Sequence, residues 1–412
     1  MTRVLVTDAR LGSAVAVIRS LGRAGYDVIA ADSRPFSAGI YSRYACGRLR
    51  YPVPQTFPDD VVDALLETAR TRSIDLIFPV TDEVIMPLSE QRDRFDGVCT
   101  LALPDPGVLA LAWDKNATFD LARRLSIPTP RTAQVTTVEE ALDAADDLGW
   151  PVVLKPQASR ILRTGSAVEA FSVGYANTPR ELEERMRHLE GRTTVLLQEY
   201  CSGEARGVGL LAVDGETLRA FEYRRLREMP PTGGPSSFRE SVPLDDVHYD
   251  HATRLARALR WTGLAMIEFK GADPATLMEV NGRVWGSIAL AVKSGVDFPA
   301  EAARLYLTGD VARTSGAYSV GVRSRDLRLE VSWIAAVLRG RRKYPFIAYP
   351  PRRAALGVAL RLFDSRDGFD VLSWKDPKAS LAEIGSLGWR YYAKLKRDRS
   401  SRRAEVPEGS IS

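Results

Sequence analysis

The stretch 264–287, LAMIEFKGADPATLMEVNGRVWGS, carries the pattern that decides the fold. Two β-prone runs, Leu264–Phe269 and Leu277–Val280, flank a turn-rich GADPAT segment, and this predicts a hairpin with a loose loop. Symmetric pairing about the loop sets Glu268 opposite Glu279. Stepping by two residues from Glu279 brings further polar side chains to the same face, whereas the other face is apolar. The polar residues are Asn281 and Arg283, and the apolar ones are Ile267, Phe269, Met278 and Val280.

Facing carboxylates on a hairpin lie roughly 5 Å apart and repel each other. Together with the amide oxygen of Asn281, Glu268 and Glu279 make an all-oxygen set. Such a set suits a hard divalent cation, and magnesium usually keeps phosphate oxygens as its other ligands. The alternative is an ordinary solvated face of mixed charge.

The composition indicates a globular protein of several domains. A chain of 412 residues is too long for one ordinary core, so two to four domains are expected. The start MTRVLVTDAR does not resemble a signal peptide, and no apolar run reaches the ~18 residues of a membrane span, so we expect a cytoplasmic protein. Three cysteines without metal-type spacing predict reduced thiols, and three histidines give little material for a histidine triad or zinc site.

The basic character is concentrated at the C-terminal end. The net charge is +5, yet from Arg339 onward there are 17 Lys/Arg against 8 Asp/Glu. A mildly basic tail is only weak support for nucleic-acid or lipid binding, and we predict no nucleic-acid partner. Val331–Leu338 with Trp333, followed by basic residues, allows two interpretations: a weak peripheral membrane contact, or a helix packed on the body with a solvated edge.

The N-terminal region predicts a β-α-β opening of a doubly wound sheet. Its first turn, TDARLGSA, lacks the G-x-G-x-x-G pattern, so a nicotinamide-type pyrophosphate loop is not supported. The strand DLIFPV is followed at once by Thr81, Asp82 and Glu83. Because ligands collect at the carboxyl ends of strands in such sheets, Asp82 and Glu83 are candidate substrate residues; the alternative is a helix N-cap.

Two lysines lie at positions that would be favourable if an anion were bound beside them. An exposed Lys115 is expected in the first turn of a helix, where a cation is disfavoured unless it faces an anion. Lys155 lies at the exit of the buried strand WPVVLKPQ, where it could contact a phosphate. The alternative interpretation is a surface lysine whose aliphatic stem packs on the protein while its ammonium reaches solvent. The segment 157–169 is small, polar and glycine-containing, as in a mobile loop over phosphates. A basic, Pro/Gly/Ser-rich loop follows Arg224 and Arg225.

The order of these features resembles the ATP-grasp superfamily, in particular its carboxylate–amine ligases related to the large chain of carbamoyl-phosphate synthase. The resemblance covers roughly residues 1–310 and rests on four spaced motifs. They are the Lys115 helix, the V-V-L-K-P strand, the Q-E-Y linker, and the hairpin M-I-E-F-K…L-M-E-V-N-G-R. Gly282 departs from the proline that many relatives have after the asparagine.

The resemblance implies an α/β ATP-grasp fold: a pre-ATP-grasp domain (1–110), a lid (111–192), a nucleotide- and metal-binding part (193–315) and a C-terminal extension (316–412). It also implies roles, residue by residue. Lys115 and Lys155 would hold ATP phosphates, with 157–169 closing over them. Gln198, Glu199 and Cys201 would receive adenine, and Glu204 the ribose. Glu268, Glu279 and Asn281 would bind Mg²⁺ (or Mn²⁺), and Arg283, with Lys155, would act on the transferred phosphoryl group. Arg224 and Arg225 would meet substrate.

The implied activity is an ADP-forming ligase that joins a small-molecule carboxylate to an amine through an acyl phosphate, as a monomer or homodimer. Two alternatives remain open: bicarbonate activation as in carboxylases, and a non-catalytic ATP-binding scaffold. The scaffold has no need of two facing carboxylates, which cost stability when no cation is bound.

Overall fold

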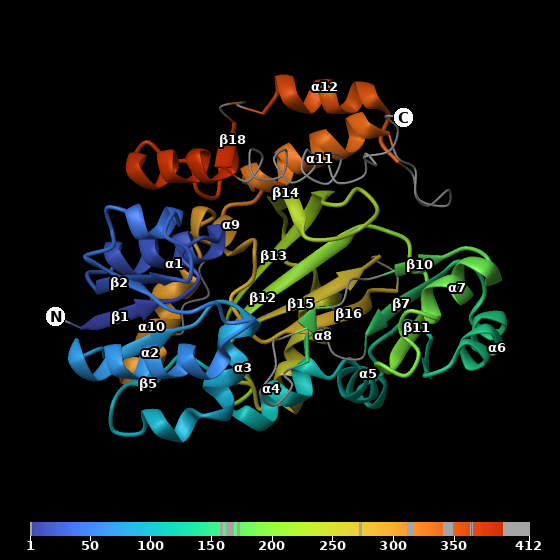
Figure 1. Cartoon of the computed structure of the whole chain (residues 1–412), viewed down its shortest axis with the longest axis horizontal. Helices are drawn as coiled ribbons and strands as arrows, with labels where there is room; N and C mark the ends of the chain where they lie inside the picture. Colours follow the sequence, from blue (N-terminus) through green and yellow to red (C-terminus); the bar gives the residue numbers. More distant parts are fainter. Residues whose placement is uncertain are drawn as a thin grey trace, which may run out of the picture.

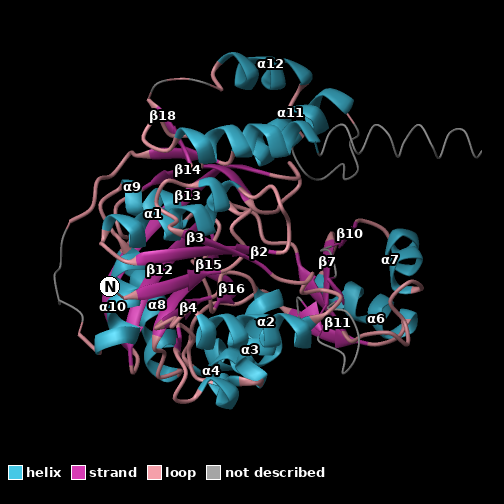
Figure 2. Ribbon diagram, turned by 60° about the vertical axis from the view of Figure 1, so that its left-hand side comes forward, coloured by secondary structure: helices cyan, strands magenta, loops and turns pink. Residues whose placement is uncertain are grey.

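The computed structural model describes residues 2–156, 160–161, 169–170, 174–271, 274–310, 317–340, 349–362, 364 and 366–389 (Figure 1). Within these residues the strands form sheets of five, four and seven strands and one two-stranded pair. The five-stranded and four-stranded sheets lie on opposite sides of the molecule, with the seven-stranded sheet between them (Figures 1 and 2).

The five-stranded sheet is parallel throughout, in the order β3-β2-β1-β4-β5. This arrangement confirms the doubly wound domain predicted from the β-α-β opening. Its short apolar strands suit a sheet that is covered on both faces. The elements are β1 (Arg3–Val6), α1 (Gly12–Arg23), β2 (Asp27–Asp32), η1 (Ala38–Tyr41), β3 (Gly47–Arg50), α2 (Pro58–Thr71), β4 (Leu76–Phe78), α3 (Asp82–Glu90), η2 (Arg92–Phe95), β5 (Thr100–Leu101) and α4 (Pro106–Trp113).

The four-stranded sheet, β10-β7-β11-β6, is antiparallel and has a small hydrophobic core of its own. Helix α6 begins with a capping box in which Thr137 and Glu140 bond each other's backbone N–H groups. The elements from α5 onward are α5 (Lys115–Arg124), β6 (Thr132–Val135), α6 (Val138–Leu148), β7 (Val152–Pro156), β8 (Arg160–Ile161), β9 (Glu169–Ala170), β10 (Gly174–Ala176), α7 (Pro179–Met186) and β11 (Val195–Glu199).

The seven-stranded sheet has the order β16-β15-β12-β13-β14-β17-β18. It supplies the hairpin and most of the remaining structure. The elements are β12 (Ala205–Val213), β13 (Glu216–Glu228), β14 (Ser236–Ser241), α8 (Asp246–Ala258), β15 (Gly263–Lys270), β16 (Thr276–Asn281), α9 (Ile288–Lys293), α10 (Phe298–Thr308), β17 (Arg323–Arg325), α11 (Leu327–Arg339), α12 (Arg352–Leu360) and β18 (Asp367–Phe369). A further helix covers 377–389.

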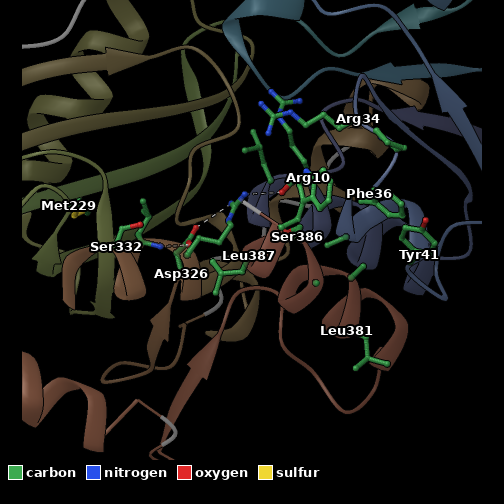
Figure 3. A pocket seen from close by; sticks show the side chains of 18 of the residues that line it. Arg10, Arg34, Phe36, Tyr41, Met229, Asp326, Ser332, Leu381, Ser386 and Leu387 are labelled. Atoms are coloured by element: carbon green, nitrogen blue, oxygen red, sulfur yellow. Dashed lines mark hydrogen bonds and ion pairs between the residues drawn. The ribbon is translucent and has the colours of Figure 1, made fainter. Parts of the chain in front are cut away.

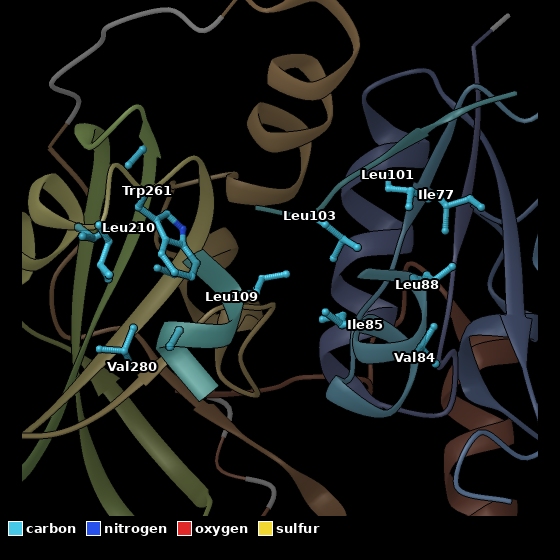
Figure 4. Packing of buried hydrophobic residues seen from close by; sticks show 14 of the residues in the cluster. Ile77, Val84, Ile85, Leu88, Leu101, Leu103, Leu109, Leu210, Trp261 and Val280 are labelled. Atoms are coloured by element: carbon cyan, nitrogen blue, oxygen red, sulfur yellow. The ribbon is translucent and has the colours of Figure 1, made fainter. Parts of the chain in front are cut away.

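The large hydrophobic core joins the seven-stranded sheet to the N-terminal domain. Trp261 and Val280 lie on one side of it, and Ile85 and Leu103 on the other (Figure 4). Leu109 on α4 lies between the two sides (Figure 4). This packing holds the carboxyl ends of β1 and β4 in a fixed position beside the hairpin.

The hairpin of β15 and β16 confirms the predicted register, because Glu268 pairs with Glu279. A β-bulge between Glu268 and Phe269 then shifts the pairing by one residue. Leu277 is therefore the core residue opposite Phe269, and Met278 is only half-buried. The prediction that Met278 points to the apolar face was wrong for this reason.

Residues beyond the predicted boundary at 315 belong to the same sheet, because β17 and β18 extend it past β14. A set of mostly buried ion pairs holds these strands in place, and we call it the clamp cluster. Glu330 accepts from Arg325 at 2.7 Å and from Arg227 at 2.6 Å, and the other two pairs are Arg325–Asp367 and Arg239–Asp370. The clamp cluster therefore consists of Arg227, Arg239, Arg325, Glu330, Asp367 and Asp370.

The apolar face of α11 is turned inward. Trp333 and Val337 are buried and pack against Ala355 of α12. This supports the interpretation of a helix packed on the body over that of a membrane contact through Trp333, while the basic residues 341–343 lie outside the described part of the chain. In the described residues, no helix is long and apolar enough to cross a membrane.

Candidate active site

Each carboxylate of the hairpin pair contacts a cation from a different element. Arg225 on β13 approaches Glu268 at 2.5 Å, and Lys115 at the start of α5 lies 3.0 Å from Glu279. The side chains of Glu268 and Glu279 are 19% and 33% exposed. The hairpin face therefore collects charges of both signs in a partly open position.

Lys115 is buried, so the expectation of an exposed lysine was wrong. Helix α5 begins directly after Asp114, whose carboxylate accepts from the N–H groups of Asn116 and Ala117. That cap fixes the first turn, and the lysine at its first position points toward Glu279. The hairpin carboxylate thus offsets the unfavourable effect of a cation at this helix end.

Lys155 on β7 belongs to the same group of charges. Burial lowers the pKa of Lys155 to about 8; Glu279 opposes this effect and the positive charge of Lys115 adds to it. A lysine whose pKa falls this far lacks enough negative charge around it. A bound polyanion would supply that charge.

The two carboxylates of the pair differ in how readily they ionise. Burial raises the pKa of Glu279, but Lys115, Lys155 and Arg283 outweigh it and hold the pKa well below its usual range. Burial raises the pKa of Glu268, and Arg225 only partly offsets that effect while Glu279 adds to it. When two carboxylates face each other, one commonly has a lowered pKa and ionises readily while the other has a raised pKa. A divalent cation between them would remove the conflict.

Asp82, at the start of α3, reaches Arg283 across the interface between the N-terminal domain and the hairpin. The guanidinium Nε of Arg283 donates to Asp82 at 2.8 Å, and the indole of Trp113 also donates to this carboxylate at 3.3 Å. Asp82 therefore lies with the predicted phosphoryl arginine. Glu83 does not: it is buried and accepts from Gln55 at 3.2 Å.

The carboxyl end of β11 presents a buried acceptor that has no partner in the described structure. Gln198 donates through Nε2 to Thr132 at 2.9 Å, but its buried Oε1 has no hydrogen bond within the described structure. The carboxylate of Glu199 accepts from the backbone N–H and from the guanidinium of Arg131, at 2.9 and 2.8 Å.

Cys201 follows in the linker and is half-buried. Burial raises the pKa of its thiol and the charge of Glu199 adds to this effect, whereas the charges of Lys155 and Lys270 oppose it.

Arg224 and Glu204 do not join the site. Side chains alternate along a strand, so neighbouring residues of β13 point to opposite faces of the sheet. Arg225 contacts Glu268, whereas Arg224 binds Glu240 at 2.6 Å and Glu204 at 3.4 Å. We therefore correct the pairing of Arg224 with Arg225 as substrate residues, and Glu204 is engaged by arginines on the other face.

Lys270 is a site residue that the sequence analysis missed. Its ammonium lies 5.3 Å from the ring centre of Tyr200, and its charge acts on both Lys155 and Cys201. The sequence did contain a sign of this role, because Lys270 follows Glu268 by two residues and so lies on the same face of the strand. The stepping rule that led from Glu279 to Arg283 also leads from Glu268 to Lys270.

The residues present fit ATP and a divalent cation. Glu268, Glu279 and the amide of Asn281 offer oxygens of the type magnesium prefers, and Lys115, Lys155 and Arg283 offer charge for phosphates. The orphaned Oε1 of Gln198 could accept from a nucleobase amino group. Considering only His, Cys, Asp and Glu, the described residues contain no metal-type group of three, and the proposed set differs by its asparagine. Most of the predicted phosphate loop, 157–169, lies outside the described residues.

Comparisons with known proteins find an ATP-grasp family over part of the chain. Residues 192–327 match the family model described as ATP-grasp in the biosynthetic pathway with Ter operon. The chain is 28% identical over 224 residues to formate-dependent phosphoribosylglycinamide formyltransferase from Synechococcus sp. (strain CC9605), covering 53% of this chain and 52% of that protein. It is 26% identical over 386 residues to the carbamoyl phosphate synthase large chain of Thermus thermophilus, covering 90% of this chain and 34% of that one. The match thus spans about half, or less, of these relatives.

A solved structure shows the likeness of fold. The biotin carboxylase domain of Hydrogenobacter thermophilus 2-oxoglutarate carboxylase, in complex with MgADP, ADP and bicarbonate, superposes with a TM-score of 0.60. The match covers 78% of this chain and 73% of that chain at 18% identity. At this identity the similarity concerns the fold, and the ATP-grasp architecture predicted from the sequence is confirmed.

Proposed function

We propose that this chain, which has the ATP-grasp fold, is an ATP-dependent ligase that joins a carboxylate to an amine and releases ADP and phosphate. The observation that carries the proposal is the meeting of Glu268 and Glu279 with Lys115, Lys155 and Arg283 at one place, although these residues come from three parts of the chain. A protein that bound neither a nucleotide nor a cation would gain nothing from this unbalanced group of charges, and a non-catalytic ATP-binding scaffold would bind ATP without turning it over.

The chemistry requires positioning and charge neutralisation more than a nucleophile from the protein. A substrate carboxylate oxygen attacks the γ-phosphorus of ATP and the bond to the β,γ-bridging oxygen breaks, which gives an acyl phosphate and ADP. The amine then attacks the acyl carbon, phosphate leaves, and the amine loses a proton. Lys115 and Lys155 would neutralise the phosphates, and Arg283, held by Asp82, would neutralise the group being transferred.

Magnesium, or manganese in its place, would neutralise phosphate oxygens and orient them when bound. Glu268, Glu279 and Asn281 would hold it. Lys115 and Arg225 contact the two carboxylates in this structure, so they would have to exchange these contacts for others when the cation binds.

The test is ADP release with panels of carboxylates and amines, alone and in pairs. The proposal expects one carboxylate to stimulate ADP formation and its amine partner to convert the product to an amide. Lys155→Ala and Glu279→Ala should abolish both. If no pair stimulates ADP release while ATP binds normally, the chain is a nucleotide-binding protein and not a ligase.

Bicarbonate belongs in the carboxylate panel. Bicarbonate-dependent ADP release without any organic acid would replace the proposed reaction by the carboxylase-type alternative on the same site. The response to organic acids and to bicarbonate therefore separates the two enzymes.

A further inference from the structure

A large cleft is lined by residues other than those of the candidate active site. Its volume is about 1820 Å³. Typical small-molecule pockets are roughly 300–1,000 Å³, so this space would hold a larger ligand. Three segments that are distant in sequence form its walls: the loops after β1 and β2, helix α11, and the helix at 377–389 (Figure 3).

Arg328 fixes these walls relative to one another. Its guanidinium donates to the carbonyl oxygen of Arg10 at 3.1 Å and lies 3.5 Å from Asp326 and 3.0 Å from Glu383. Figure 3 shows the first two of these contacts spanning the cleft wall. The cleft is therefore a built feature of the fold and not a gap between unconnected parts.

The cleft carries an excess of positive charge, to which three cations contribute, because Arg10 and Arg328 are already paired with carboxylates. Its lining contains five basic residues and one acidic residue, Asp326, which already caps α11 and contacts Arg328. The exposed side chains of Arg34, Arg339 and Lys378 have no ion-pair partner among the described residues. An anionic ligand would find unpaired cations here.

The same walls carry exposed apolar side chains. Phe36 is 68% exposed, Leu381 68% and Trp389 67%, although each lines a concave surface. Large apolar side chains that share a hollow commonly mark a binding site. The combination of cations and apolar surface matches an amphiphile better than it matches a nucleotide or a sugar.

Two separate links join the cleft to the candidate active site. On the N-terminal side, Arg10 binds Asp8 at 2.8 Å, and Asp8 accepts from Thr81, the neighbour of the Asp82 that holds Arg283. On the other side, the cleft residue Met229 lies four positions after Arg225, which contacts Glu268. The cleft and the place where phosphoryl transfer is proposed are therefore connected through two segments of the chain.

We propose that this cleft binds the carboxylate substrate, and that this substrate is an anionic amphiphile with an extended apolar body. The inference rests on the proposed ligase function. The apolar body lies against Phe36, Leu381 and Trp389. The unpaired cations of the cleft hold the acid before ATP binds, and its carboxylate then moves from them to the site, on the side of Arg10.

The test measures binding separately from turnover. Decanoate, decyl phosphate and decylamine, each below its micelle concentration, are titrated by calorimetry and by tryptophan fluorescence without ATP. We expect both anions to bind and decylamine not to bind. The fluorescence response should persist in Trp374→Phe, which alters a fully exposed tryptophan outside the cleft, and should disappear in Trp389→Phe.

Charge reversal tests the cations. Arg34→Glu with Lys378→Glu should weaken decanoate binding roughly tenfold or more, because two attractions become repulsions. The matched control, Arg124→Glu with Lys375→Glu, changes two exposed cations outside the cleft and should leave binding unchanged. Equal melting temperatures show that both variants fold.

The remaining outcomes separate the two proposals. Decanoate, and not decyl phosphate, should stimulate ADP release with a suitable amine. Binding that is insensitive to the charge reversal, or no binding of either anion, overturns the cleft assignment even if another acid supports ligation. Binding of decyl phosphate alone overturns the assignment of a carboxylate substrate to the cleft.

Discussion

The clamp cluster and the candidate active site both join basic side chains to carboxylates, but only the candidate site also sets two carboxylates opposite each other. In the clamp cluster the carboxylates face cations: Glu330 is fully buried and accepts from Arg227, Arg325 and Ser237. In the candidate site Glu268 faces Glu279, and the pKa of Lys155 is lowered. The first arrangement is complete without a ligand, whereas the second would be completed by a cation and a polyanion.

Removing Glu330 should produce the largest effect on stability. Glu330→Ala leaves the guanidinium groups of Arg227 and Arg325 with one fewer buried partner, so the free energy of unfolding should fall by about 3–5 kcal/mol. Urea denaturation measures this. Glu184→Ala, which removes a carboxylate paired with Arg180 on an exposed helix, should cost less than about 1 kcal/mol. Similar losses in the two variants would remove the distinction between a clamp and a surface pair.

Glu279→Gln should act mainly on activity, whereas Glu330→Ala acts mainly on stability. It removes one charge from the proposed cation site, so substrate-stimulated ADP release should fall by about 10²–10³-fold, as for other groups that stabilise developing charge. Glu279 also pairs with the buried Lys115, so the melting temperature should fall too, but by less than in Glu330→Ala, because the Glu279 side chain is one-third exposed and Glu330 is fully buried. A variant with normal turnover would show that the facing carboxylates are structural, like the clamp cluster.

The two regions also differ in how far the sequence predicts them. The hairpin is local, because one short loop joins its two strands, and strand alternation alone therefore sets Glu268 opposite Glu279. Alternation could not reveal the bulge that puts Leu277 in the place expected for Met278, because a bulge depends on how the loop closes. The facing carboxylates were thus predictable, whereas the apolar face beyond the bulge was not.

Arg224 and Arg225 show the same limit. Alternation puts the two arginines on opposite faces, but the register of β13 on β12, and of β12 on β15, decides which of them shares a face with Glu268, and the sequence carries no sign of that register. The clamp cluster could not be predicted for a different reason. Its pairs join residues up to 131 positions apart, as in Arg239 and Asp370, so no local pattern connects them.

The pH dependence of ATP binding tests whether Lys155 binds a polyanion. In the free protein Lys155 has a pKa of about 8, so it is charged below that pH and loses its charge as the pH rises through it. ATP favours the charged form, so the apparent Kd should rise above about pH 8, by up to roughly tenfold per pH unit. Titrations between about pH 7 and 10 measure this, because the ordinary lysine pKa of about 10.4 sets the upper end of the range.

Lys155→Arg is the matched control, because an arginine remains charged over the whole range. Its Kd should stay flat above pH 8, whatever its absolute value. If the wild-type Kd is also flat, Lys155 does not contact the phosphates, and its lowered pKa reflects only a structural burial.

The smallest expected difference separates two neighbours in the chain. Arg225→Ala removes the cation that would leave Glu268 for the bound substrate when the metal binds, so kcat/KM should fall roughly tenfold, which corresponds to about 1.4 kcal/mol. Arg224→Ala alters the other face of the sheet, where Glu240 keeps Arg323 as a second partner at 2.7 Å. Its kcat/KM should change by less than about threefold. Equal losses of kcat/KM would mean that both faces of β13 act on the reaction. The distinction between the catalytic face that carries Arg225 and the structural face that carries Arg224 would then be wrong.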